Sequence, residues 1–286
     1  MACDVEVGTK QQINVIENSN AHCQNAQNIN RNPYGFERKF AVVNGKKMSY
    51  FSVGNDKNTL VFLHGWGSDA TAFFFAMKQL CAKYRVIALD FFGFGQSDFP
   101  PDYYDVAHYA NDVAKLLEIL GIEKATFLGH SFGGRVAIEL AAFYPQIVNR
   151  IVLIDSAGIK PRRKPSYYLK VLAHKILKKL GKSGLKGSSD YSMLSDDMKK
   201  VFVKVVNYDQ KNLLEKIKCP CAVFWGKSDK ETPLYMYKCF LKKIDGAQGF
   251  LLDGGHFAFV EDRYAFLLIL GAYLAETDEG ISKTTS

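Results

Sequence analysis

The 286-residue chain lacks a hydrophobic run long enough to cross a membrane. Its longest nearly apolar stretch, residues 265–275, has 11 residues, whereas a spanning helix needs about 18. The N-terminus has no basic head followed by an apolar stretch, so it does not show the pattern of a secretory signal. The 6 cysteines are spaced neither as a zinc site nor as a disulfide framework. These absences predict a reduced, cytoplasmic protein without a metal site or a transmembrane segment.

Acidic residues are missing from one long segment. Residues 157–189 contain ten lysines and arginines and no acid, so the chain's formal charge of +8 comes entirely from this segment. A nucleic-acid binder is usually basic over a whole face or domain, and this distribution therefore predicts no nucleic-acid partner. The segment could dock on an anionic surface or on an acidic carrier protein. The alternative is that its lysines simply face solvent.

Short apolar runs alternate with helical patterns along most of the chain. Strands are expected at residues 59–63, 85–90, 125–128, 151–154, 222–225 and 249–252. Helices are expected at residues 71–82, 106–120, 132–144, 234–244 and 263–275. A β-hairpin is expected at residues 37–53, where Asn44 and Gly45 match a type I′ turn. The alternation predicts an α/β protein whose mainly parallel sheet is covered by helices on both faces.

The alternation breaks once, over more than 60 residues after the strand at 151–154. Two amphipathic helices fit there, one at residues 166–180 and one that follows Ser195 as its N-cap. A helical insertion at this edge of a parallel sheet can form a lid over a ligand, or it can be a packing elaboration. The expected organisation is a polar N-terminal extension at 1–33, a core at 34–156 and 213–276, a helical lid at 157–212 and a polar tail at 277–286.

The residues Gly129-His130-Ser131-Phe132-Gly133 match the G-x-S-x-G pattern of a nucleophile elbow. In such an elbow the serine lies on a tight turn between a strand and a helix, and glycines are needed where side chains would collide. The pattern alone is weak, but an expected strand precedes it and an expected helix follows it. Ser131 is therefore the predicted nucleophile.

A serine nucleophile needs a base, and the base needs an acid that orients it. Among the 6 histidines, His256 lies in a loop after the last expected strand, where it can reach the sheet edge. Asp229 and Asp155 both follow strands and are the two candidate acids. Asp229 is preferred because it gives the chain order Ser131, Asp229, His256 of α/β-hydrolases.

The segment His64-Gly65-Trp66-Gly67 follows the strand at 59–63 and is predicted to hold the oxyanion. The main-chain N–H groups of Trp66 and Phe132 are the two expected donors. A second glycine-rich loop, residues 90–97, lacks the Gly-Lys-Ser/Thr ending of a phosphate loop. It is interpreted as a structural loop held by Asp90 and Ser97.

These motifs, in this order, resemble the α/β-hydrolase superfamily from about residue 36 to residue 275. The resemblance implies an α/β-hydrolase fold with a mostly parallel eight-stranded sheet, a lid after the sixth strand and no cofactor. His-Gly-Trp-Gly with Gly-His-Ser-Phe-Gly-Gly is similar to small carboxylesterases, including the biotin-pathway type. The expected function is cleavage of a small-molecule carboxylic ester by Ser131, His256 and Asp229 through an acyl-enzyme.

Two other functions stay open at this point. Hydrolases that cleave C–C bonds of dienone acids usually carry Asn before the serine and Trp after the histidine. This chain has His130 and Phe257 at those positions. A ligand-binding protein of the same fold without catalysis is the other alternative, since a fold does not determine a function.

Overall fold

The computed structural model describes residues 32–160 and 194–284, with the side chains described as far as residue 276. The described residues from Arg38 onward belong to one compact unit. The expected helix at 166–180 and nearly all of the basic segment lie outside the described residues. So does most of the N-terminal extension.

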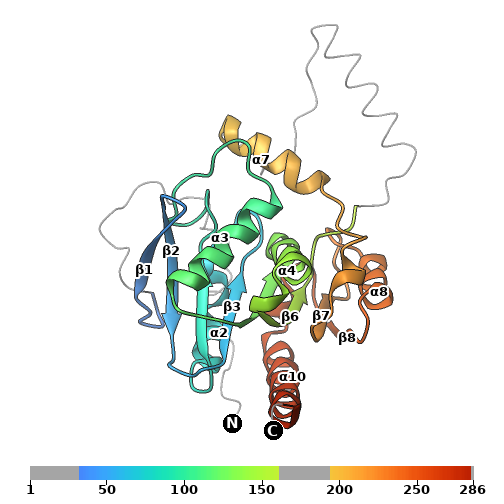
Figure 1. Cartoon of the computed structure of the whole chain (residues 1–286). Helices are drawn as coiled ribbons and strands as arrows, with labels where there is room; N and C mark the ends of the chain where they lie inside the picture. The colour runs from blue at the N-terminus through green and yellow to red at the C-terminus, as the bar shows by residue number, and fades with distance from the viewer. Residues whose placement is uncertain (1–31, 161–193, 285–286) are drawn as a thin grey trace, which may run out of the picture. The chain divides into compact units, whose positions relative to one another are not determined.

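The described strands form one eight-stranded sheet in the order β1-β2-β4-β3-β5-β6-β7-β8 (Figure 1). β1 and β2 make an antiparallel hairpin, and β2 pairs antiparallel with β4. All other neighbours are parallel. The expected mainly parallel sheet is therefore confirmed. The strands are β1 Arg38–Val43, β2 Lys46–Val53, β3 Thr59–Leu63, β4 Arg85–Leu89, β5 Ala125–His130, β6 Val148–Ile154, β7 Cys221–Gly226 and β8 Gln248–Leu252.

The hairpin turn has the expected geometry. Asn44 and Gly45 have φ angles of 49° and 77°, and both values lie in the left-handed region that a type I′ turn requires. Glycine reaches this region at little cost, and asparagine tolerates it better than most residues.

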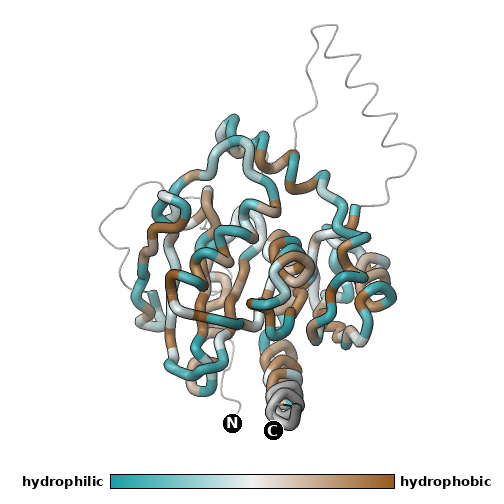
Figure 2. Tube along the Cα trace, in the orientation of Figure 1, coloured by the Kyte–Doolittle hydropathy of each residue, from teal (hydrophilic) through white to brown (hydrophobic). Residues whose placement is uncertain are grey.

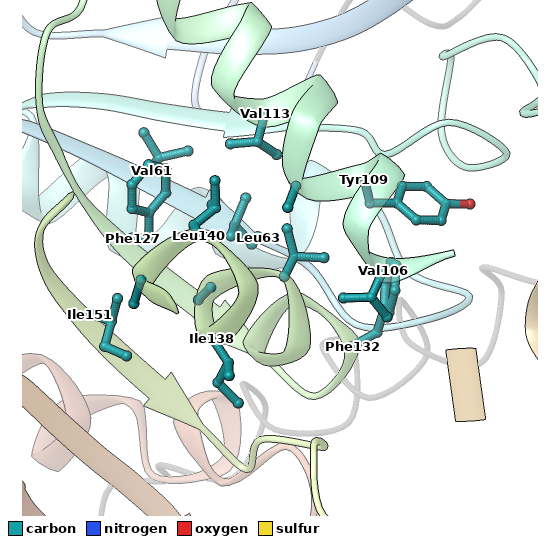
Figure 3. Packing of buried hydrophobic residues seen from close by; sticks show 14 of the residues in the cluster. Val61, Leu63, Val106, Tyr109, Val113, Phe127, Phe132, Ile138, Leu140 and Ile151 are labelled. Carbon is teal, nitrogen blue, oxygen red and sulfur yellow. The ribbon is translucent and has the colours of Figure 1, made fainter. Parts of the chain in front are cut away.

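Helices cover both faces of the sheet because alternate side chains of each buried strand point to opposite sides. Val61 and Leu63 of β3 pack in a core with α3 and α4 (Figure 3). Phe62, between them, packs against Phe73 on the other face, with the two ring centroids 4.8 Å apart. Figure 2 shows apolar residues concentrated along the central strands. The helices are η2 Ala70–Phe73, α2 Phe74–Leu80, α3 Val106–Ile119, α4 Phe132–Phe143, η3 Pro145–Ile147, α7 Asp196–Asn207, η4 Leu214–Lys216, α8 Leu234–Lys243, α9 Ala258–Glu261 and α10 Arg263–Thr284.

Three helical features differ from the expectation. The predicted helix at 71–82 begins as the 3₁₀ turn η2, since Asp69 accepts the Thr71 N–H and caps it there. The short helix α9 was not predicted, because four residues are too few to show a helical period. α10 continues past the predicted end at residue 275 to Thr284. Among the described helices, none is both long and apolar enough to cross a membrane.

Helix α7 confirms the second predicted helix of the insertion. The Ser195 side chain accepts the Met198 N–H and caps the helix, and Met198, Val201 and Val205 are buried. The Phe202 ring lies 5.2 Å from that of Trp66, which follows β3. α7 thus packs over the loop at the carboxyl end of β3, beside the site described below (Figure 1).

Asp90 links four segments at the carboxyl end of β4. Its buried carboxylate accepts the Ala70 N–H at 2.9 Å, the Gln96 N–H at 3.0 Å and a hydrogen bond from Arg38. The Ser97 hydroxyl donates to the Asp90 carbonyl at 2.7 Å. The interpretation of residues 90–97 as a structural loop held by Asp90 and Ser97 is confirmed.

We expect Asp90→Asn to lower the free energy of unfolding by about 2–4 kcal/mol. The amide cannot accept all three hydrogen bonds, and Arg38 loses its counter-charge in a partly buried place. Urea denaturation followed by circular dichroism measures the loss. Glu118→Gln is the control, because it breaks only the exposed Lys115–Glu118 ion pair and should change little. Equal urea midpoints for Asp90→Asn and the wild type would contradict this account.

Candidate active site

Ser131 lies on a strained turn between β5 and α4. Its φ of 50° and ψ of −108° are outside the regions that ordinary residues adopt, and such a residue costs about 1–3 kcal/mol. The flanking glycines make the turn feasible. A Cβ on Gly133 would lie 2.0 Å from the Leu63 carbonyl oxygen, and one on Gly129 would lie 2.4 Å from the Gly133 carbonyl oxygen. The packing of the elbow against β3 therefore excludes a side chain at Gly133, and the tightness of the elbow itself excludes one at Gly129.

The structure brings together the three residues that the sequence singled out. The His256 Nε2 lies 3.0 Å from the Ser131 Oγ, and the His256 Nδ1 lies 2.8 Å from the Asp229 Oδ2. The three residues come from the ends of β5, β7 and β8, which are separated in sequence but meet at one edge of the sheet. The arrangement can pass a proton from a serine hydroxyl to an imidazole.

The Asp229 carboxylate is held by its own loop. One oxygen accepts the main-chain N–H groups of Glu231 at 2.7 Å and Thr232 at 3.0 Å, and the other accepts the Thr232 hydroxyl at 2.5 Å. Burial alone would raise the pKa of Asp229, but the hydrogen bonds from His256 and Thr232 outweigh it and hold the pKa below its usual value. Asp229 is thus ionised at neutral pH. The His256 Nδ1 must carry a hydrogen to donate to it, which leaves Nε2 free to accept from Ser131.

Asp155, the other candidate acid, is close to this group but makes no hydrogen bond to His256. It follows β6, is fully buried and has a φ of 43°. Its Oδ1 accepts the Gly226 N–H at 2.7 Å. Burial raises the pKa of Asp155 to about 9, and the neighbouring Asp229 charge contributes to the rise. At neutral pH it is therefore a neutral carboxylic acid, whereas Asp229 is a carboxylate.

Two buried histidines fix the loops of the site. The His130 Nε2 donates to the His256 carbonyl at 2.8 Å, so the residue before the serine holds the loop of the imidazole. Burial lowers the pKa of His130 to about 3 and keeps it neutral. The His64 Nδ1 donates to the Gly65 carbonyl at 2.8 Å, and its Nε2 accepts the Phe91 N–H at 3.0 Å. Sequence reasoning placed both histidines in turns but missed these bridges, which join segments 126 and 27 residues apart.

Trp66 and Phe132 lie beside Ser131, with their ring centroids 5.4 Å apart. Phe132 is the first residue of α4, where main-chain N–H groups have no acceptor within the helix. Both residues line a cleft of about 330 Å³ at the carboxyl edge of the sheet. The cleft is lined by Gly65, Trp66, Ser68, His130, Ser131, Phe132, Arg135, Ala157, Phe202, Val205, Val206, Glu231, His256 and Phe257.

Glu231 and Arg135 are two charged residues of this cleft that sequence reasoning did not identify. The Glu231 Oε2 lies 3.4 Å from the His256 Nε2, and its side chain is 70% exposed at the rim. Arg135 is buried one helical turn after Ser131. The sequence could have indicated Arg135 through its position four residues after the elbow serine, since residues four apart share a helix face. In the part of the chain that the structure describes, no group of three or more His, Cys, Asp or Glu residues could hold a metal ion.

Comparisons with known proteins agree with this geometry. A family model described as alpha/beta hydrolase fold matches residues 58–179. An uncharacterized protein of Mycobacterium tuberculosis is 37% identical over 121 residues, which are 42% of this chain and 35% of that protein. The chain thus matches only about a third of the length of that relative. An uncharacterized hydrolase of Bacillus subtilis is 28% identical over 229 residues, 70% of this chain and 84% of that protein.

Solved structures share the fold over most of the chain. A meta-cleavage product hydrolase from Pseudomonas fluorescens is similar with a TM-score of 0.67 and 25% identity, over 83% of this chain and 97% of that one. An esterase from Exiguobacterium antarcticum has a TM-score of 0.69 and 22% identity, over 84% of this chain and 100% of that one. The family model spans the elbow and the solved hydrolases share the fold over most of the chain, so the chain has the α/β-hydrolase fold.

Proposed function

We propose that the protein is a serine hydrolase that cleaves a carboxylic ester through an acyl-enzyme. The observation that carries the proposal is the pair of hydrogen bonds that joins Asp229, His256 and Ser131, at 2.8 and 3.0 Å. The position of Ser131 on a strained elbow, open to a cleft, adds to it.

In the first half of the reaction the Ser131 Oγ attacks the ester carbonyl carbon while its proton passes to the His256 Nε2. Asp229 stabilises the imidazolium that forms. The tetrahedral intermediate then breaks its bond to the alcohol oxygen, which takes the proton from Nε2 and leaves. In the second half, water attacks the acyl group, His256 accepts and returns the proton, and the acid is released.

The negative oxygen of the intermediate needs donors that are already in place. The main-chain N–H groups of Phe132 and Trp66 are the proposed pair, since both residues line the cleft beside Ser131. The loss of one such donor costs about 10²–10³ in rate in serine hydrolases. The hydrogen bonds of His64 hold the Trp66 loop in its conformation, so they support this role indirectly.

Cleavage of a C–C bond in a dienone acid is the second candidate. The likeness to a meta-cleavage product hydrolase at 25% identity favours it, and the same serine, histidine and aspartate could serve it. A non-catalytic ligand-binding role is disfavoured by the intact hydrogen-bonded group. Docking of the basic segment on an anionic surface or an acidic carrier protein, and a cytoplasmic location, stay predictions.

We expect Ser131→Ala to abolish covalent labelling by a fluorophosphonate probe and to lower ester hydrolysis by about 10⁴-fold or more, because the nucleophile is lost. Mass spectrometry of the labelled wild-type protein should place the adduct on Ser131. An adduct on another residue, with hydrolysis retained in Ser131→Ala, would show that the mechanism is wrong.

The two candidate acids are separated by isosteric substitutions. Asp229→Asn should lower kcat by about 10³–10⁴-fold, because the amide cannot hold His256 in the tautomer that accepts from Ser131. Asp155→Asn should keep kcat within about tenfold of the wild type, since the amide is neutral like the buried acid it replaces. Steady-state kinetics at pH 7.5 measure both. The reverse order of effects would assign the acid to Asp155.

Asp155 should also affect how the stability of the folded protein depends on pH. The pKa of Asp155 in the folded protein, about 9, lies far above the usual value. Between pH 5 and pH 8 the carboxyl group is therefore protonated in the folded protein and ionised in the unfolded chain, so that unfolding releases a proton. Stability falls with rising pH over that range for this reason. Asp155→Asn removes the effect. The melting temperature of the variant minus that of the wild type should therefore increase from pH 5 to pH 8. A constant difference between the two proteins would contradict the raised pKa.

A further inference from the structure

Arg135 is a buried cation in the wall of the cleft. It lies four residues after Ser131 on α4, so the two share one side of the helix at its N-terminal end. Only 5% of Arg135 is exposed, yet it lines the same cleft of about 330 Å³ as Ser131 and His256. Burial lowers the pKa of Arg135 to about 10, and the guanidinium is still charged at neutral pH.

A buried charge is normally paired with an opposite one. Among the residues that the structure describes, no carboxylate forms an ion pair with Arg135. The acid whose charge acts on it most is Asp209, which is exposed. Residues 161–193, which are outside the description, contain a single acid, Asp190. In the part of the chain that the structure describes, the cation of the cleft therefore has no carboxylate bound to it.

One contact of Arg135 has a structural purpose. Its Nη1 donates to the carbonyl oxygen of Tyr208, the C-cap of α7, at 2.5 Å. A cation at the C-terminal end of a helix is favourable. A guanidinium has five N–H donors, however, and this hydrogen bond uses one of them.

The surroundings of Arg135 favour an anionic ligand on its side of the cleft. Phe202, Val205 and Val206 of α7 make that wall apolar, and a charge interaction is stronger away from water. Glu231 is the acid of the cleft, and it lies at the rim beside His256. An anionic group is therefore repelled near His256 and attracted towards Arg135, which gives the ligand one orientation.

We propose that Arg135 binds a carboxylate of the substrate, so that the ester cleaved is a small one that carries a carboxylate besides its scissile bond. The proposal rests on the proposed function and names its substrate class. The planar fork of arginine matches the two oxygens of a carboxylate. The cleft volume of about 330 Å³ is near the lower end of the range for ligand sites, which favours a short chain between the carboxylate and the ester.

Matched pairs of esters test the proposal. Monomethyl succinate and methyl butanoate differ by a carboxylate on the acyl side, and 3-acetoxypropanoate and propyl acetate differ by one on the alcohol side. At pH 7.5 we expect the wild type to prefer the acidic member of at least one pair by about 10–100-fold in kcat/KM. In Arg135→Gln this preference should disappear, chiefly through a higher KM. Arg135→Lys, which keeps the charge without the fork, should be intermediate.

Arg150→Gln is the matched control. Arg150 is also buried, and its Nη1 also donates to a main-chain carbonyl, that of Leu274, at 3.1 Å. It does not line the cleft. A general loss of stability should appear in both variants, but the ratio between the two esters of a pair should change only in Arg135→Gln.

A wild type that does not discriminate within either pair would overturn the proposal. So would an Arg135→Gln variant that loses activity equally on both members, because Arg135 would then only support α7. Calorimetric titration with succinate separates this from a failure of the proposed function. Succinate should bind the wild type and not Arg135→Gln, even if no ester is cleaved. Absence of fluorophosphonate labelling and of all ester hydrolysis would overturn the ester hydrolase assignment alone.

Discussion

The close packing of the elbow against β3 is the constraint on which the site depends. Gly133 lies so near the Leu63 carbonyl that no side chain fits between them, and this contact brings the start of α4 to the end of β3. Ser131 is held at a φ of 50° as a consequence. The same contact places the first residue of α4 beside the loop that carries Trp66. The proposed nucleophile and its proposed oxyanion donors thus lie at one point of close backbone packing.

The loops around the elbow are joined by hydrogen bonds of buried, neutral histidines. His130 connects the elbow to the loop of His256, and His64 connects the Trp66 loop to the chain after β4. Asp90 fixes that chain in turn through main-chain and side-chain hydrogen bonds. Loops at a sheet edge are usually the most mobile parts of a fold. Here each one is tied to its neighbour, which keeps the distances between Ser131, His256 and Asp229 short.

The ionisable side chains around the site differ in their protonation states and in their burial. Asp229 is ionised because its hydrogen bonds outweigh its burial, while Asp155 is neutral because burial and the nearby Asp229 charge act together. Arg135 adds a buried cation on the apolar side of the cleft, and Glu231 adds an exposed anion at the rim. A buried cation on one side of the cleft and an exposed anion at its rim would together select both the charge and the orientation of a substrate.

Much of this molecule was predictable from local sequence patterns. The strands, the type I′ turn at Asn44 and Gly45, and the elbow follow from hydrophobic period and glycine placement, which act over a few residues. The short helix α9 was not predictable because four residues are too few to show a helical period, and the continuation of α10 past residue 275 was not predictable because residues 276–284 are mostly polar. Tertiary structure alone decided the protonation states of Asp155 and Asp229. It also decided that Arg135 has no ion-pair partner among the described residues. Burial and long-range hydrogen bonds set the energy of a charge, and neither is a property of the residues adjacent to it in the chain.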